Sequence, residues 1–146
     1  MVVFIGCVKQ KKNYKTQAQD LYDSVFFEKC LNFAKSYNPK NIYILSAKYG
    51  LLNLTDEIEP YECTLNNMSI KEQKNWSEKV LNQMKQHDID FSEETVWLCG
   101  NNYRKYLLQN FQKYSCPLEG LGIGKQLKFM TDKLNSRIDI ESEVLW

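Results

Sequence analysis

Three short runs of the sequence combine β-branched and aromatic residues with an absence of charge. They cover residues 2–7, 42–45 and 95–99. Runs of this kind are typical of strands that are buried on both faces of a parallel sheet. Segments with helical periodicity separate them, and such alternation favours βαβ units. We therefore predict an α/β fold in three layers, with a short, mostly parallel sheet of three or four strands and helices on both faces.

The predicted helices have recognisable start signals. Ser24 is placed to cap a helix whose apolar residues recur with a period of 3.6. Residues 69–72 form a capping box at the start of the next helix. Tyr103, Leu107 and Phe111 share one helical stripe, which predicts a helix after the third strand. We expect a single α/β domain over residues 1–146, long enough to bury roughly two-thirds of the surface of the unfolded chain.

The composition excludes several classes of protein. Charged residues make up 25% of the chain and the formal net charge is +1, so the overall charge does not favour nucleic acid or a membrane. No apolar run approaches the length of a membrane span. The five cysteines include no C-x-x-C pair, which argues against a disulfide framework or a zinc site. We expect a cytoplasmic protein with reduced thiols, no metal and no cofactor.

The second strand leads into an unusual segment. Residues 46–50 are small and polar and end in glycine, and about fifteen residues without helical or strand periodicity follow. Loops of this length inside a compact domain are usually functional. This loop leaves the carboxyl end of a buried strand, where open α/β sheets bind ligands. We therefore expect the functional site to lie here.

All three predicted strands bring distinctive residues to the same edge of the sheet, because the carboxyl ends of parallel strands meet there. We expect Lys9, Ser46, Tyr49 and Arg104 to surround one concavity. The full set of candidate substrate- or phosphate-binding residues is Cys7, Lys9, Lys11, Ser46, Lys48, Tyr49, Gly50, Gly100, Asn101, Tyr103 and Arg104.

Glu59 and Tyr61 are the candidate catalytic residues. They flank Pro60, which restricts the backbone on both sides and so limits the freedom of the two side chains. A carboxylate held in this way can act as a general acid or base. The alternative is a surface turn with a solvated glutamate.

The basic candidates also allow two interpretations. Lys9 and Lys11 suit a phosphate group, or they belong to a solvated loop. Arg104 either binds a phosphate through two hydrogen bonds, beside a helix start capped by Asn101 or Asn102, or forms a surface salt bridge. Cys7 is either a reactive thiol near lysines or a small buried residue.

A glycine-rich segment, residues 120–124, precedes the last predicted helix. Its spacing is not that of a dinucleotide-binding loop. It either turns the chain into the helix or lets the backbone approach a ligand closely.

Four sequence segments carry a family resemblance: ILSAKYGLL, EPYECTL, CVKQK and GNNYR. Together they resemble a family of small bacterial and phage proteins of unassigned function. That family is distantly similar to the YaaA peroxide-stress proteins and to the catalytic domain of archaeosine synthase, a tRNA base-modifying enzyme. The usual opening, Cys-Ser-Lys-x-Lys, has Val8 in place of serine here, so any role of that hydroxyl is lost. The resemblance implies action on DNA or tRNA bases.

These observations favour an enzyme that acts on a nucleotide or nucleic-acid base, by N-glycosidic bond cleavage or by base modification or exchange. A carboxylate would support the oxocarbenium-like centre of such a reaction. The alternatives are a non-catalytic nucleic-acid-binding protein in stress protection or phage defence, and an adaptor without a ligand. The expected partner is a nucleotide, DNA or tRNA, and the oligomeric state is left open.

Overall fold

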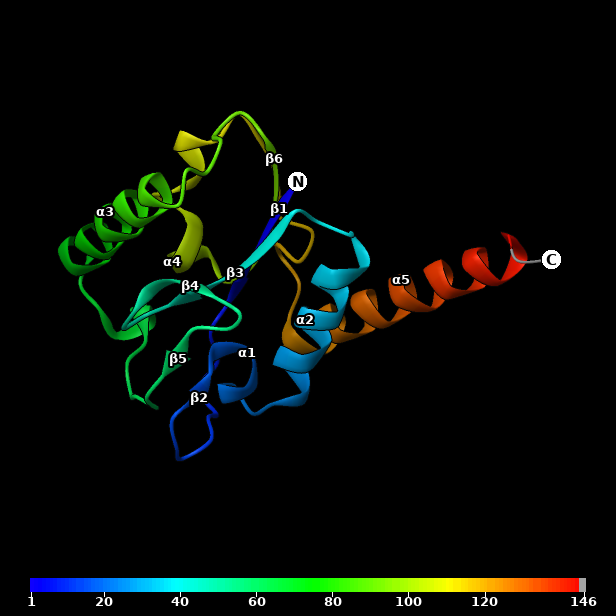
Figure 1. The fold of residues 1–146 in the computed structure, drawn as a ribbon, viewed down its shortest axis with the longest axis horizontal. Helices are drawn as coiled ribbons and strands as arrows, with labels where there is room; N and C mark the ends of the chain where they lie inside the picture. The colour runs from blue at the N-terminus through cyan, green and yellow to red at the C-terminus, as the bar shows by residue number, and fades with distance from the viewer. Residues whose placement is uncertain (145–146) are drawn as a thin grey trace.

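The computed structural model describes the backbone of residues 1–144 and the side chains of residues 1–137, so the last residues of the predicted domain lie outside it. Five strands form one mixed sheet in the order β4-β3-β1-β6-β7 (Figure 1). β1 pairs in parallel with β3 and β6, and β6 pairs in parallel with β7. The predicted α/β fold with a mostly parallel sheet is confirmed. The strand bounds are Val2–Gly6 (β1), Asn41–Ser46 (β3), Gly50–Asn53 (β4), Glu94–Leu98 (β6) and Lys113–Ser115 (β7).

Helices cover both faces of this sheet (Figure 1). In β1, Val3 and Ile5 face the cluster that contains α2 and α5, whereas Val2 and Phe4 face the cluster that contains α3. Successive side chains of a strand point to opposite faces, so an uncharged strand supplies both cores. The helices are Ala18–Leu21 (α1), Val25–Ser36 (α2), Ile70–Gln86 (α3), Asn101–Arg104 (α4) and Ile123–Val144 (α5).

Two predicted helix starts are confirmed at atomic detail. The Ser24 hydroxyl accepts a hydrogen bond from the Phe27 N–H at 3.0 Å. Ser69 and Glu72 form the reciprocal bonds of a capping box, each side chain accepting from the backbone N–H of the other. These bonds satisfy N–H groups that the first helical turn leaves without partners.

The loop predicted after β3 is partly wrong, because it contains two strands. β4 folds back and pairs antiparallel with β3, with Gly50 opposite Ser46. Gly50 has a φ of +79°, which glycine adopts without strain and which permits this tight reversal. Further along, Glu57–Ile58 (β5) pairs with Thr16–Gln17 (β2) in a small separate sheet. The two strands are too short to give a visible alternation in the sequence.

The helix predicted after β6, with Tyr103, Leu107 and Phe111 on one stripe, is present but much shorter than expected. α4 ends at Arg104, and the chain continues through turns and a 3-10 segment, Leu108–Asn110 (η2), to β7. Tyr103, Leu107 and Phe111 are nevertheless all buried in the core beside α3. A spacing of four residues therefore identified the buried side chains correctly but did not distinguish a helix from a compact series of turns.

The topology creates a switch point between β1 and β6. From β1 the chain passes over one face through α2 to β3, and it returns over the other face through α3 to β6. β6 lies on the opposite side of β1 from β3. The connections that leave neighbouring strands β1 and β6 thus diverge to opposite faces, which opens a crevice at their carboxyl ends.

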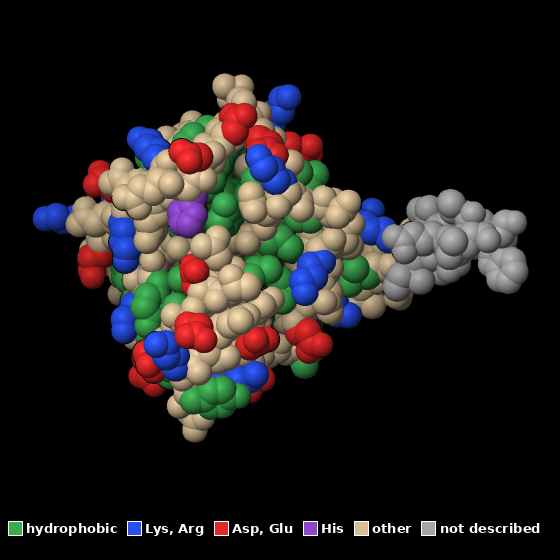
Figure 2. Space-filling model, viewed as in Figure 1, with side chains coloured by type: hydrophobic (Ala, Val, Ile, Leu, Met, Phe, Trp, Pro, Cys, Tyr) green, Lys and Arg blue, Asp and Glu red, His purple; other side chains and the backbone are tan. Residues whose placement is uncertain are grey.

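The surface carries both signs of charge. Figure 2 shows basic and acidic side chains interspersed over the face that it presents, in keeping with the net charge of +1. Among the helices within residues 1–144, none combines the length and apolar character needed to cross a membrane.

Candidate functional site

A cavity of about 360 Å³ lies at the topological switch point. It is lined by the end of β1 (residues 6–8), by the β6–α4 turn (residues 98–101 with Tyr103 and Arg104), and by the segment that leads into α5 (residues 118–121 with Ile123 and Gln126). Phe26, near the start of α2, completes the wall. We call this the switch-point cavity. Its position agrees with the rule that open α/β sheets bind ligands where the strand order reverses.

The cavity has a polar side and an apolar side. Arg104, Asn101 and Glu119 supply the polar groups, and Val8 and Phe26 belong to the apolar wall. The apolar wall is extended by Leu118, Leu121 and Ile123. Apolar walls with a few convergent polar groups are typical of small-molecule sites.

Arg104 is the main charged group of the cavity. It is only 5% exposed. One of its terminal nitrogens, Nη1, donates to the carbonyl of Cys99 at 2.6 Å, and the other, Nη2, lies 3.4 Å from the carboxylate of Glu119. A guanidinium has five N–H donors, so these two contacts leave donors free for a ligand. The structure shows the salt bridge, one of the two roles expected for Arg104, and the phosphate contact stays a prediction.

Cys7 lies in the same cavity and contacts Tyr103. The Cys7 thiol donates to the Tyr103 hydroxyl at 3.5 Å, and the same hydroxyl accepts from the Leu65 N–H at 3.4 Å. Burial raises the pKa of Tyr103, which keeps its phenol protonated. The ring of Tyr103 packs edge-on against Trp76. This residue is therefore part of the core, and it also lines the cavity.

Two other cysteines near Arg104, Cys99 and Cys116, are protonated thiols. Burial raises the pKa of Cys99 to about 12 and also raises the pKa of Cys116. A thiol with a raised pKa is a poor nucleophile at neutral pH. All five cysteines of the chain are unpaired in the structure.

A second group of candidates forms a buried hydroxyl cluster, which comprises Tyr22, Ser46 and Tyr61. The Ser46 hydroxyl donates to the Tyr61 hydroxyl at 2.8 Å and accepts from the Tyr49 N–H at 3.0 Å. The hydroxyls of Tyr61 and Tyr22 are 2.7 Å apart. Burial raises the pKa of both tyrosines, so both phenols stay protonated near neutral pH. Tyr61 can exchange hydrogen bonds, but it is not a phenolate base.

Lys11 covers the hydroxyl cluster. Its Nζ lies 4.5 Å from the centre of the Tyr61 ring and donates to the carbonyl of Lys9 at 3.1 Å. Partial burial lowers the pKa of this lysine. Cation–π contact with an aromatic face compensates in part for the lost hydration.

The remaining candidates lie outside the cavity. The side chains of Lys9, Lys48 and Glu59 are exposed. The backbone carbonyl of Glu59 accepts a hydrogen bond from the Tyr49 hydroxyl at 3.1 Å. Gly50 shapes the β3–β4 turn, where an added Cβ would collide with the Gln83 side chain.

The structure therefore divides the predicted site into two neighbouring groups. Arg104 lines the switch-point cavity, whereas Lys9, Ser46 and Tyr49 do not, so the expectation of one concavity around these four residues is wrong. Of the thirteen candidates, the cavity brings together Cys7, Gly100, Asn101, Tyr103 and Arg104.

The predicted capping of α4 by an asparagine is wrong as well. Gly100 is the N-cap residue and makes no side-chain bond. The Asn102 amide donates instead to the Asn66 side chain at 2.8 Å. Asn101 is exposed at the cavity, where its amide is free to face a ligand.

Sequence reasoning missed several residues of the two groups. Tyr22 belongs to the hydroxyl cluster, and Phe26, Glu119 and Gln126 line the cavity. The glycine-rich segment was a usable signal, because Gly120 lines the cavity with a φ of +77°. For Tyr22 and Phe26 the sequence carries no such signal, since each fits an ordinary core position.

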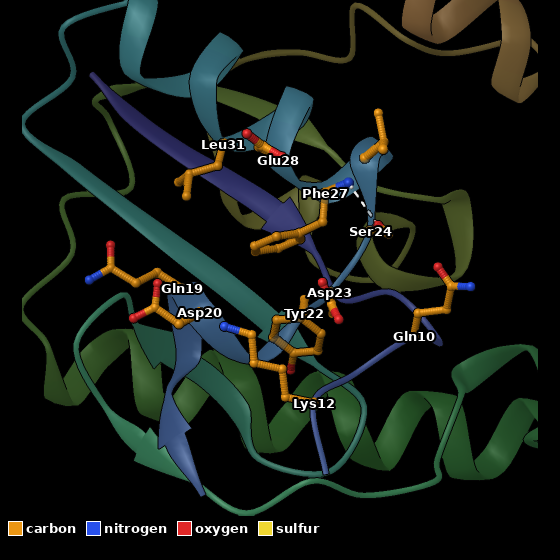
Figure 3. Close-up of a pocket in the computed structure, with 11 residues that line it drawn as sticks. Gln10, Lys12, Gln19, Asp20, Tyr22, Asp23, Ser24, Phe27, Glu28 and Leu31 are labelled. Carbon is orange, nitrogen blue, oxygen red and sulfur yellow. Dashed lines mark hydrogen bonds between the residues drawn. The ribbon is translucent and has the colours of Figure 1, made fainter. Parts of the chain in front are cut away.

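A larger and more open cavity, about 530 Å³, lies beside the N-terminus of α2 (Figure 3). Its lining includes the aromatic residues Tyr22 and Phe27 and the charged residues Asp20, Asp23, Glu28 and Lys12. Three carboxylates against one lysine disfavour an anion. We call it the outer cavity; none of its lining residues is among the predicted site residues. Within the described side chains, no three His, Cys, Asp or Glu residues converge in a way that could hold a metal ion.

Comparison with known proteins gives one match. No curated protein and no solved structure matches the chain, so the similarity to YaaA and to archaeosine synthase stays a prediction. The sequence pattern of a family of unknown function, DUF6884, matches residues 2–132. Because the match covers most of the sequence, the protein belongs to the DUF6884 family.

Proposed function

We propose that this protein is an enzyme that binds a nucleotide, or a nucleotide unit of DNA or tRNA, in the switch-point cavity and acts on its N-glycosidic bond. Hydrolysis of that bond adds water across it: the hydroxyl joins the sugar carbon and the base leaves with a proton. Base exchange replaces the water with a second base. Both reactions pass through an oxocarbenium-like centre that a carboxylate stabilises.

The observation that carries the proposal is the buried Arg104 in a cavity at the strand switch point. A guanidinium with spare donors in a partly apolar cavity suits a phosphate group, which it can bind through two parallel hydrogen bonds. The chain presents this group at the crevice where related topologies bind nucleotides.

The apolar wall supports the same ligand class. Phe26, Val8 and Leu121 offer a surface on which a flat, uncharged base can pack. The volume of about 360 Å³ is near the lower end of the range for small-molecule sites, about 300–1,000 Å³.

For the chemical step we retain Glu59 as the carboxylate and Tyr61 as a hydrogen-bonding partner. Glu59 is next to Pro60, and its carbonyl is anchored by the Tyr49 hydroxyl. The exposed carboxylate is thus carried on a restrained segment beside the hydroxyl cluster. Tyr61, protonated and bonded to Ser46, can support a proton transfer but cannot begin one.

A second function, nucleic-acid binding without catalysis in stress protection or phage defence, is favoured by a different observation. The side chain of Glu59 is exposed and is not among the residues that line the cavity. In the described part of the chain, the carboxylate that does line the cavity is Glu119, which is already paired with Arg104. A binding protein needs no further carboxylate.

We also propose a cytoplasmic location. Five unpaired cysteines fit a reducing compartment, and nucleotides and tRNA are available there.

The Glu59→Gln variant separates the two functions. If Glu59 acts in the reaction, release of free base from nucleosides, nucleotides, modified DNA or tRNA should fall by roughly 100-fold, while ligand affinity stays within about twofold. The matched control is Glu57→Gln, which removes an equally exposed carboxylate two residues away. It should leave turnover unchanged.

The outcomes distinguish the hypotheses. Binding together with turnover that depends on Glu59 supports the enzyme. Binding with no base release from any substrate favours the non-catalytic protein. If wild-type protein binds no member of the panel, both functions are wrong.

A further inference from the structure

The contact between Arg104 and Glu119 joins a buried cation to an exposed anion. The side chain of Arg104 is 6% exposed and that of Glu119 is 71% exposed, with 3.4 Å between Nη2 and the carboxylate oxygen. In the described part of the chain, Glu119 is the only acidic side chain within ion-pair distance of Arg104. A buried charge without a counterion is costly, so Arg104 needs this partner when the cavity holds no ligand.

The same pair is easy to separate. Solvent screens an ion pair that has one exposed member, so separating these two charges costs less than in a fully buried pair. The backbone around Glu119 is held independently of its side chain, because the Glu119 N–H donates to the Cys116 carbonyl at 3.1 Å and the Leu121 N–H donates to the Leu118 carbonyl at 3.3 Å. The carboxylate can therefore swing into solvent while the chain stays in place.

The position of Arg104 is likewise independent of Glu119. Its Nη1 is fixed by the Cys99 carbonyl at the end of β6. Nη2 and the remaining donors stay directed by this anchor after the carboxylate has left, so the receptor for an anion is already formed.

We propose that Glu119 is a resident counterion which the anionic group of the ligand displaces from Arg104. Resting on the proposed nucleotide-binding function, this makes the switch-point cavity selective for phosphorylated nucleosides over free nucleosides. A phosphate dianion carries more charge than the carboxylate and forms two charge-assisted hydrogen bonds with a guanidinium. A free nucleoside has no group that competes with Glu119 for Arg104.

The Glu119→Gln variant tests this exchange. Loss of the competing charge should raise the affinity for nucleoside 5′-monophosphates and for inorganic phosphate by about tenfold, and should leave the affinity for the matching nucleosides unchanged. Because Glu119 is exposed and Arg104 keeps its bond to the Cys99 carbonyl, the variant should fold, with a lower free energy of unfolding that added phosphate restores. The control is Glu94→Gln, which removes the same charge from the amino end of β6, away from the cavity, and should raise neither affinity.

Two measurements are needed: isothermal titration with the three probe types, and the ¹⁵N side-chain resonance of Arg104 during a titration with inorganic phosphate. A gain confined to phosphorylated probes, with a shift of the Arg104 resonance, supports the exchange. Equal gains in both glutamine variants would mean a general charge effect and would overturn it, as would unchanged or weaker phosphate binding in Glu119→Gln.

The two proposals fail in different ways. If phosphate binds at Arg104 more tightly in Glu119→Gln but no nucleoside or nucleotide binds, the counterion exchange stands and the nucleotide function is wrong. If nucleotides bind and Glu119→Gln gives no gain, the exchange is wrong and the nucleotide function stands. If neither protein binds phosphate or nucleotide, both are wrong.

Discussion

The hydroxyl cluster and the switch-point cavity lie next to each other at the carboxyl end of the sheet, and they satisfy their polar groups differently. In the cluster, each hydroxyl has a partner inside the protein: Ser46 bonds to Tyr61 and Tyr49, and Tyr61 bonds to Tyr22. In the cavity, the buried Arg104 has one backbone partner and one exposed carboxylate. Arg104 also lines the cavity, and a guanidinium has further N–H donors beyond these two contacts.

This difference distinguishes polar groups that stabilise the fold from polar groups that can bind a ligand. A polar network that is complete inside the protein stabilises a unique packing, and a ligand must displace an internal partner to bond to it. A buried cation with spare donors beside an open volume is costly to the fold unless a ligand or counterion completes it. On these grounds we infer that the cluster holds the β3 end and the Glu59 segment in position, and we propose the cavity as the binding site.

The largest effect should come from Arg104→Lys. Lysine keeps the charge but loses the planar fork that binds phosphate through two bonds. We expect affinity for nucleoside monophosphates to fall by about 30-fold, or about 2 kcal/mol. The measurement is isothermal titration, with Arg137→Lys as the control, because Arg137 stacks on Phe33 and Tyr37 between α5 and α2. Equal affinity of wild type and Arg104→Lys for nucleoside monophosphates would contradict the claim that the cavity, and not the hydroxyl cluster, binds the ligand.

Tyr61→Phe should act on stability instead of binding. It leaves the buried hydroxyls of Ser46 and Tyr22 without their shared partner, so the free energy of unfolding in urea should fall by about 2 kcal/mol. Tyr49→Phe, which loses only a contact to the exposed Glu59 segment, should cost less than about 0.5 kcal/mol. A decrease in ligand affinity without a decrease in stability would mean that the cluster is part of the binding site.

Tyr61→Phe should also change how the free energy of unfolding depends on pH in the alkaline range. Burial raises the pKa of Tyr61 in the folded protein above its ordinary value of 10.0. The unfolded chain then loses this proton first, so the stabilisation is complete below about pH 10 and declines as the pH rises further. Tyr61→Phe should flatten this decline above about pH 10.

The smallest effect should come from the exposed lysines. Lys9 and Lys48 lie outside the cavity, and at physiological salt their charges are screened within about 8 Å. The double variant Lys9→Gln, Lys48→Gln should weaken nucleotide binding by less than about twofold. A tenfold loss in the same titration would show that the ligand extends across the basic loop, as a nucleic acid does.

The sequence predicted the framework better than the site. Uncharged runs and capping residues identified β1, β3, β6, α2 and α3, because burial on two faces and unpaired N–H groups at helix ends leave strong local patterns. β4 and the turns after α4 were missed, since their conformation depends on Gly50 at positive φ and on packing against α3. Local sequence carries little of that information.

For the site, the predicted convergence of strand ends was correct for Cys7, Gly100 and Arg104. The sequence could not separate Ser46 and Tyr61 from this group. Parallel topology brings all strand ends to one edge, but it does not determine which side chains point into the cavity. The antiparallel return of β4 fixes Ser46 opposite Gly50, and the Ser46 hydroxyl bonds to Tyr61 within the core.

The most direct test of the account is the location of the ligand. A titration of the ¹⁵N-labelled protein with nucleoside 5′-monophosphates, followed by amide and arginine side-chain NMR, reports every contact at once. The account predicts that the largest shifts occur at Cys7, Asn101, Arg104 and Gly120, around the switch-point cavity. Shifts confined to Lys12, Asp23 and Glu28 of the outer cavity, or to the exposed lysines, would contradict it.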